Sequence, residues 1–301
     1  MQQNPMNLIK FQRKFATEKA CQEHLFRLRW PQGYQCPRCS HDQTYFHRTR
    51  HLYQCKACGY QASLTAGTIF HKTRTLLTKW FWMIFLMGRQ KSGISMLSLQ
   101  RMLEIKGYKT VWTMGHKIRK AMAERDAHYK LAGLIEVDDT YFGSPKPGAR
   151  GRGAAGKAKV VVAVETQRDK PGFATMQQVE HLSGEWISQV LKDRLEEDVV
   201  SRTDGWRAYG VLNSGRNTHQ PVVVGSGKNA VKVLPWVHTL IANSKGNIRG
   251  VYHGVSSKHL QRYLSEYCYR FNRRFWESQM FDRILTACVC TNTVTYSELK
   301  P

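Results

Sequence analysis

The sequence predicts a multi-domain α/β protein with an N-terminal ribbon, a small helical domain and a mixed-sheet domain. Three observations carry this prediction. Two C-x-x-C pairs lie near the N-terminus, a segment with helical periodicity follows them, and strand-like and helix-like segments alternate after residue 130. The length of 301 residues fits about two domains of ordinary size.

We expect five regions along the chain. They are a helical lead-in at residues 1–30, a ribbon at 31–72, a helix-turn-helix-like domain at 73–130, a mixed-sheet domain at 131–275 and a C-terminal tail at 276–301.

Basic residues outnumber acidic residues, with 46 Lys and Arg against 22 Asp and Glu and a formal net charge of +24. Lys and Arg that neutralise phosphates release counterions, so a polyanion is the expected partner. The alternative is a charge that only keeps the chain soluble. An anionic membrane surface is a third possibility, but no basic amphipathic helix supports it.

Hydrophobic residues make up 42% of the chain, which excludes disorder along its whole length. The longest apolar run, Trp80 to Met87, is far shorter than the ~20 residues of a membrane-spanning helix. The first residues contain no secretory signal, so we expect a cytoplasmic protein in a reducing compartment.

Four cysteines have the spacing of a structural zinc ribbon: Cys36, Cys39, Cys55 and Cys58. Four thiolates complete a tetrahedral shell and leave no open position, so the zinc ion should fold the segment and not catalyse. Disulfides or redox pairs are the alternative, disfavoured by the expected reducing compartment. The other four cysteines, Cys21, Cys268, Cys288 and Cys290, are expected to be buried thiols.

The loop between the two pairs, Ser40 to Gln54, is rich in basic and aromatic side chains. A ribbon hairpin of this kind could contact nucleic acid, or it could be a solvated loop.

Residues 75–125 have helical periodicity. An apolar stripe comprises Leu76, Leu77, Trp80, Phe81, Ile84 and Phe85. A short helix at 95–104, a turn at Gly107 and a basic helix at 109–122 then have the outline of a helix-turn-helix. Its second helix should direct Lys109, His116, Lys117, Arg119 and Lys120 outward. We expect Lys109, Lys117, Arg119 and Lys120 to contact DNA; the alternative is a plain helical bundle.

Beyond Leu131 the expected order is three strands, then helix, strand, helix, strand and helix. This is the secondary-structure order of a ribonuclease-H-like domain, which presents carboxylates on adjacent strands. A basic, Gly-rich segment at 144–159 follows the first strand and is interpreted as a basic flap beside a metal site, ordered by a polyanion, or as an inert hairpin loop. Its DNA-contacting candidates are Arg150, Arg152 and Lys157.

Carboxylates cluster on the first and fourth strands of this region. Alternation places Glu136 and Asp138 on one face of the first strand and Asp139 on the other, while Asp204 ends the fourth strand. Carboxylates at strand ends can share Mg(II) or Mn(II) ions for phosphodiester chemistry. The alternative is a set of helix caps and surface charges.

Several motifs, in order along the chain, carry a resemblance to a known family. They are CPRC and CKAC, SLTAGTIFHKTRTLLTKWF, EVDDTYFG, RTDGWRAY and GVYHGVSSKHLQRYLSEYCYRFNRR. Together they resemble bacterial insertion-sequence transposases that carry a zinc ribbon and a DDE-type catalytic domain, over residues 30–275. The resemblance implies that Asp138 and Asp204 are the first two catalytic aspartates.

The third catalytic position departs from the family pattern. Members commonly have Glu on a helix with Lys seven residues later, and the corresponding residues here are His238 and Lys245. Imidazole can bind a metal ion but is softer than carboxylate. Asn243 and Glu266 are the other candidates, although the position of Glu266 off the apolar stripe of its helix favours a solvated residue. Lys245 fits a phosphate-positioning role.

The resemblance implies a transposase that binds terminal inverted repeats and uses Mg(II) or Mn(II) to cleave and transfer DNA strands. It further implies a homo-oligomer on DNA, associated with the nucleoid, without a small-molecule cofactor. The alternative is a noncatalytic zinc-ribbon DNA-binding regulator or an inactivated derivative.

Overall fold

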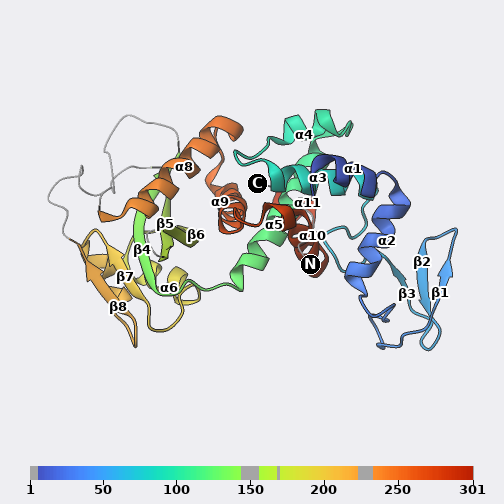
Figure 1. The fold of residues 1–301 in the computed structure, drawn as a ribbon, viewed down its shortest axis with the longest axis horizontal. Helices are drawn as coiled ribbons and strands as arrows, with labels where there is room; N and C mark the ends of the chain where they lie inside the picture. The colour runs from blue at the N-terminus through green and yellow to red at the C-terminus, as the bar shows by residue number, and fades with distance from the viewer. Residues whose placement is uncertain (1–5, 144–155, 168–169, 223–232, 301) are drawn as a thin grey trace. The chain divides into compact units, whose positions relative to one another are not determined.

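The chain forms two compact units (Figure 1). A computed structural model describes residues 6–143, 156–167, 170–222 and 233–300. The first unit comprises Met1–Glu124 and Phe275–Pro301, and the second comprises Arg125–Arg274. The predicted combination of an N-terminal ribbon, helices and a mixed sheet is confirmed.

The first unit holds most of the helices around an aromatic core. Its helices are α1 (Leu8–Lys14), α2 (Glu18–Arg29), α3 (Leu77–Arg89), α4 (Met96–Met102), α5 (Tyr108–Ala127, which continues into the second unit), the 3-10 helix η3 (Glu277–Gln279), α10 (Met280–Cys290) and α11 (Tyr296–Leu299). Phe11 of α1 stacks on Phe85 of α3 with ring centroids 4.3 Å apart. Helix α3 is buried on most of its surface, although Leu76, which was expected in its apolar stripe, is exposed just before the helix.

The ribbon is a three-stranded antiparallel sheet of β1 (Thr44–His47), β2 (Leu52–Cys55) and β3 (Gln61–Ser63), in that order. Tyr53 in the middle strand packs against Trp30 and Phe26 of the preceding helix, with ring centroids 5.4 Å away in each case. One face of the ribbon sheet is thereby covered by α2 and the residue that ends it.

Residues 276–301, predicted to be a tail, fold into the first unit instead. The Phe281 ring of α10 lies 5.0 Å from the Phe11 ring and 5.6 Å from the Phe81 ring. Met280, Phe281, Ile284, Leu285 and Cys288 recur at helical spacing and are all buried, which is the periodic signal that the prediction overlooked. Cys290 is exposed, whereas Cys21, Cys268 and Cys288 are buried as expected.

The second unit is built on a five-stranded mixed sheet with the order β6-β5-β4-β7-β8. Its strands are β4 (Leu134–Phe142), β5 (Ala158–Gln167), β6 (Lys170–Val179), β7 (Val200–Thr203) and β8 (Thr218–Pro221). The first three pair antiparallel, and β7 and β8 add parallel to β4 and to each other. The central strand is therefore the first strand in sequence, flanked by β5 and β7.

Helices cover both faces of this sheet (Figure 1). On one face, Val160, Val162 and Val164 of β5 pack with α8 (Pro235–Tyr252) and α9 (Ser257–Asn272). On the other, Val161 and Ala163 pack with α6 (Gly184–Lys192) and the 3-10 helix η2 (Arg207–Leu212). Strict alternation along a strand buried on both faces explains this near-continuous valine run.

Helix α9 contains one charged position that the sequence placed in solvent. Glu266 is buried, accepts a hydrogen bond from the Tyr252 hydroxyl at 3.3 Å and pairs with Arg270 at 3.6 Å. Arg273, just after the helix, is also buried and pairs with Asp126 at 2.6 Å. The prediction of a solvated Glu266 is therefore wrong, because a charge that is paired and hydrogen-bonded can be buried where an unpaired charge cannot. Among the described residues, none of the helices combines the length and the apolar character needed to cross a membrane.

Candidate functional site

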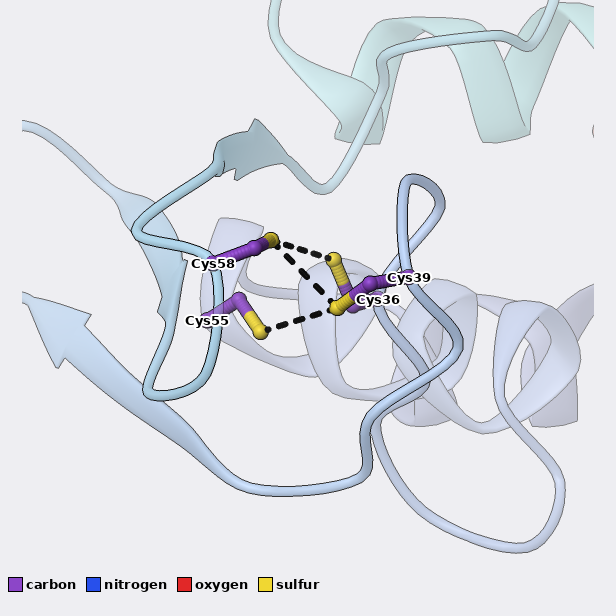
Figure 2. Close-up of side chains that lie close together, drawn as sticks. All are labelled: Cys36, Cys39, Cys55 and Cys58. Carbon is purple, nitrogen blue, oxygen red and sulfur yellow. Dashed lines mark hydrogen bonds between the residues drawn. The ribbon is translucent and has the colours of Figure 1, made fainter.

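The four ribbon cysteines form one cluster of sulfur atoms (Figure 2). Cys36 and Cys39 lie in the loop before β1, Cys55 ends β2, and Cys58 follows in a turn where Gly59 has a φ of +67°. The distances between Sγ atoms are 3.7 Å for Cys36–Cys58, 3.5 Å for Cys39–Cys55 and 3.3 Å for Cys39–Cys58. A tetrahedral zinc ion with Zn–S bonds of 2.3 Å holds its sulfur atoms about 3.8 Å apart, so this cage fits zinc.

The backbone also favours a thiolate at Cys36 in this cage. Burial raises the pKa of Cys36, but hydrogen bonds from the backbone amides of Arg38 and Cys39 outweigh it and lower that pKa to about 6. The Arg38 amide donates to the Cys36 sulfur at 3.4 Å. Because thiolates are the form that binds zinc, the turn prepares the ligand before the ion arrives.

A second cluster of polar side chains lies where β7 ends beside the middle of β4. Glu136 of β4 is in register with Arg202 of β7. Continuing that register by two residues sets Asp138 beside Asp204, which directly follows β7. One Asp204 oxygen accepts a hydrogen bond from the Trp206 amide at 3.0 Å, which fixes the carboxylate at the strand end.

Helix α8 brings His238 to these carboxylates. The Nδ1 atom of His238 lies 3.6 Å from an Asp138 carboxylate oxygen. Burial lowers the pKa of His238, against the opposing effect of the Asp204 charge, so the neutral imidazole prevails at pH 7. The Nε2 atom is buried and has no hydrogen-bond partner among the described residues.

Tyr209 of η2 lies against the same carboxylates from the opposite face of the sheet. Its hydroxyl donates to Asp139 at 3.1 Å. Burial and the charges of Asp139, Asp138 and Asp204 raise the pKa of Tyr209, so the phenol stays protonated. The predicted alternation is therefore found: Asp138 faces α8 and Asp139 faces η2.

Lys245 lies two turns after His238 on α8, on the same helical face. Burial and the nearby Lys157 lower the pKa of Lys245, whereas the Asp138 charge raises it. Its Nζ lies 5.8 Å from the ring centroid of Phe142 at the end of β4. The ammonium group of Lys245 is therefore subject both to the attraction of Asp138 and to the repulsion of Lys157 and Arg249.

The other two candidates for the third position lie elsewhere. Asn243 is exposed and, five residues after His238, points about 140° away from it around α8. Glu266 is committed to Tyr252 and Arg270. Of the three candidates, only His238 adjoins Asp138.

Glu136 has a position that the sequence did not predict. One of its carboxylate oxygens accepts hydrogen bonds from the backbone amides of Trp236 at 2.8 Å and Val237 at 2.9 Å, in the first turn of α8. The other oxygen accepts from the Thr166 hydroxyl at 3.4 Å. Leu234, the N-cap residue of α8, provides no capping side chain, so the central strand caps the helix that carries His238. Only the missing cap residue before Pro235 could have signalled this.

Comparison with known proteins gives two family matches. The ISXO2-like transposase domain matches residues 130–272, and the transposase zinc-ribbon domain matches residues 16–61, which includes α2. Together they cover more than half of the chain. The chain belongs to this transposase family.

Two individual proteins were also matched by comparison with this chain. A protein of Halobacterium salinarum, described as an uncharacterized protein in transposable element ISH50, is 26% identical over 271 residues, covering 83% of this chain and 89% of the relative. A solved structure of a pre-cleavage Mos1 transpososome aligns over 64% of this chain and 74% of that one, with 10% identity and a TM-score of 0.25.

The predicted DNA-contacting residues of the transposase have different surroundings. Arg119 and His116, expected to face outward on α5, are fully buried, so the prediction for Arg119 is wrong. Besides the apolar residues of α5, such as Val111 and Met122, the helix also buries Gly115, His116 and Arg119, because other parts of the chain pack on more than one of its sides. Arg150 and Arg152 lie outside the described residues.

Lys109 and Lys120 of α5 are engaged by the C-terminal segment of the transposase. The Lys109 Nζ lies 3.8 Å from the ring centroid of Tyr296, and the Lys120 Nζ donates to the Asn292 carbonyl at 2.8 Å. Lys117 is half-buried, and burial lowers its pKa. The basic face expected to read DNA is thus partly occupied within its own unit.

The donor set of Asp138, Asp204 and His238 suits a divalent cation with mixed oxygen and nitrogen ligands, which favours Mn(II) over Mg(II). Among the described residues, only the four cysteines bring three or more ligand atoms within 4.8 Å of one another. The ligand atoms of Asp138, Asp204 and His238 are therefore spaced more widely than the four sulfur atoms of the zinc cage.

Proposed function

We propose that this transposase binds the terminal inverted repeats of an insertion sequence and catalyses metal-dependent DNA strand cleavage and strand transfer. The observation that carries the proposal is the 3.6 Å approach of His238 to Asp138, together with the charge effects of Asp204 on His238 and of Asp138 on Lys245. These residues come from the middle of β4, the end of β7 and helix α8, far apart in the sequence. Their order in the ribonuclease-H-like element pattern also supports it.

Each of these groups has a role that follows from its charge. Asp138, Asp204 and His238 would hold Mg(II) or Mn(II), whose chemistry is to activate a water or a 3′-hydroxyl and to neutralise charge at the leaving oxygen. Lys245 would position a phosphate as a point charge. Tyr209 holds Asp139 through its hydroxyl and keeps that carboxylate on the opposite face.

The test is strand cleavage and joining on DNA that carries the ends of the element. Asp138→Asn and Asp204→Asn should each abolish product while leaving DNA binding intact, because they remove ligand charge without removing volume. Glu180→Gln is a control for the loss of one carboxylate, on an exposed residue just after β6. Full activity in both aspartate variants would refute the proposal.

A noncatalytic DNA-binding role is the second candidate, and His238 is the observation that favours it. A neutral imidazole removes one negative charge from a position where family members commonly have Glu. If this chain binds DNA without cleaving it, wild-type protein should give no product with either metal, and binding should not require a divalent ion.

His238→Glu distinguishes the two candidates. In a weakened enzyme the added carboxylate should increase Mg(II)-dependent cleavage, because Mg(II) prefers oxygen ligands. Asn243→Glu is the matched control, since it adds the same charge to an exposed position on another face of α8. An equal gain in both variants would show that position 238 is not the third ligand.

We also propose that two or more copies assemble on DNA, because joining the two ends of an element requires both ends to be held together. Sedimentation of the protein with and without end-containing DNA would measure this. A single copy on paired ends would contradict it.

A further inference from the structure

The ribbon sheet has a second face on which side chains remain exposed among the described residues of the first unit. Tyr45 of β1 lies opposite Gln54 of β2, which lies opposite Gln61 of β3. Directly opposed residues share a face, so these three side chains form one row across the sheet, on the side away from Tyr53. Tyr45 is 62% exposed, and Gln61 is also exposed.

This row is tied together by hydrogen bonds. The Gln54 Oε1 atom accepts a hydrogen bond from the side-chain Nε2 of Gln61 at 3.0 Å. The same oxygen lies 2.6 Å from the His47 Nε2. The rings of His47 and Tyr45 lie 5.0 Å apart in an edge-to-face arrangement. We name Tyr45, His47, Gln54 and Gln61 the outer ribbon face. Its amide and imidazole groups are held in fixed positions although they are at the surface.

Basic residues predominate in the segment that carries the outer ribbon face. Arg48 and Arg50 are exposed at the tip of the β1–β2 hairpin. From Gln43 to Leu103 the sequence contains no Asp or Glu, and the exposed Asp42 lies at the other end of β1 from these arginines. The hairpin tip therefore attracts a polyanion.

The chemistry of the face matches one polyanion in particular. The major groove of B-form DNA admits a two-stranded β-ribbon, and the amide of Gln pairs with the donor and acceptor edge of adenine. Arg side chains at the tip can reach phosphates on either side of the groove. An A-form RNA duplex has a major groove too deep and narrow for such a face.

We propose that the outer ribbon face, with Arg48 and Arg50, is the surface with which this protein reads duplex DNA. This inference rests on the proposed function and names its DNA-reading surface. It replaces part of the role expected for α5, whose Lys109 and Lys120 contact the C-terminal segment of their own unit.

The experiment measures binding of the full-length, zinc-loaded protein to fluorescent duplexes by anisotropy. One duplex carries the sequence flanking the coding region, a second carries the same bases scrambled, and an unlabelled RNA duplex of the first sequence serves as competitor. Affinities are measured over a series of salt concentrations. Zinc content and thermal unfolding verify that each variant is folded, which surface substitutions at exposed positions should preserve.

The double variant Arg48→Ala/Arg50→Ala should make the slope of log K against log salt shallower by about 1.8, for two lost phosphate contacts. Gln61→Ala should reduce discrimination between the two DNA duplexes at least about 5-fold while leaving the slope unchanged, because the exposed Gln61 can offer an amide oxygen and an N–H to adenine, whereas the Gln54 oxygen already accepts from Gln61 and His47. The rival surface is tested with Lys106→Ala/Lys109→Ala, two exposed cations at the α4–α5 turn. The proposal expects a smaller loss there.

Three results would overturn the inference: a slope change at Arg48 and Arg50 no larger than at Lys106 and Lys109, unchanged discrimination in Gln61→Ala, or equal competition by the RNA duplex. These outcomes leave the proposed strand cleavage untouched, since it is assayed separately. Absence of DNA binding by the wild-type protein would instead refute the proposed function.

Discussion

The contact between Glu136 and the first turn of α8 gives the sharpest prediction. Replacing Glu136 with Ala removes the acceptor for the Trp236 and Val237 amides. Glu136→Gln keeps one oxygen that can accept both bonds. Glu136→Asp keeps the charge on a side chain that is one methylene shorter and cannot reach both amides.

The magnitude follows from burial. Glu136 is 2% exposed and Val237 is buried, so in the Ala variant the Val237 amide loses its partner in a dry environment. An unsatisfied buried amide costs about 1–3 kcal/mol and a lost N-cap about 1 kcal/mol. Removing the buried carboxylate offsets part of this loss of stability, because burial raises the pKa of Glu136 and so disfavours its charged form. We expect a loss of about 3 kcal/mol in unfolding free energy for Ala and about 1 kcal/mol for Gln.

Loss of the Glu136 contact should also leave His238 less firmly positioned, because His238 directly follows Val237 in α8. Loss of a group that orients a ligand typically weakens metal binding 10-fold or more. We therefore expect the Mn(II) concentration for half-maximal DNA cleavage to rise about 10-fold in Glu136→Ala and Glu136→Asp, and to stay near the wild-type value in Glu136→Gln.

Chemical denaturation measures the stability change, and amide hydrogen exchange at Trp236 and Val237 measures the local one. Equal losses in the Ala and Gln variants would show that charge, and not hydrogen bonding, is what matters at this position. A wild-type metal requirement in the Ala variant would refute the positioning role, even if the protein is less stable.

Two further predictions concern the first unit. A strong chelator should remove one zinc ion per chain and unfold the ribbon, and Cys39→Ser should lower the zinc content whereas the exposed Cys290→Ser should not; elemental analysis with circular dichroism checks this. Burial and the neighbouring Lys14 and Arg27 lower the pKa of His24 to about 4. Because this lies below the unfolded value of 6.5, the unfolded chain binds the proton first, so up to about 3 kcal/mol of stability should be lost as pH falls from 6.5 to 4. His24→Phe, which keeps the ring against Phe15, should lack this loss in denaturation measured across that range; an unchanged pH dependence would contradict the assignment.

Local pattern was enough for the zinc cage and for the strands of the second unit. The C-x-x-C spacing places two ligands within one turn. The prediction of the zinc cage therefore needed only one further assumption, namely that the two turns, Cys36–Cys39 and Cys55–Cys58, lie together. The valine run of β5 and the EVDD segment of β4 also predicted their strands, because a strand buried on both faces is recognisable from composition alone.

Side-chain environments on the helices were less predictable. Arg119 and Glu266 are charged residues at positions where periodicity predicts solvent, yet both are buried. A helical stripe shows which face is most apolar, but it does not show how many other elements pack on the remaining faces. The packing of α10, which follows the second unit in sequence, has no local signal that connects it to Phe11.

The sequence by itself therefore determined the metal-binding ribbon, the strand order along the chain and the identity of Asp138 and Asp204 as candidates, since each depends on spacing within one or two elements. Only the tertiary structure decided that His238, and neither Asn243 nor Glu266, adjoins Asp138, and that Glu136 holds the helix that brings it there. The physical reason is that these contacts join β4 to a helix about 100 residues later. Their geometry depends on how the sheet and helix pack, which no local periodicity records.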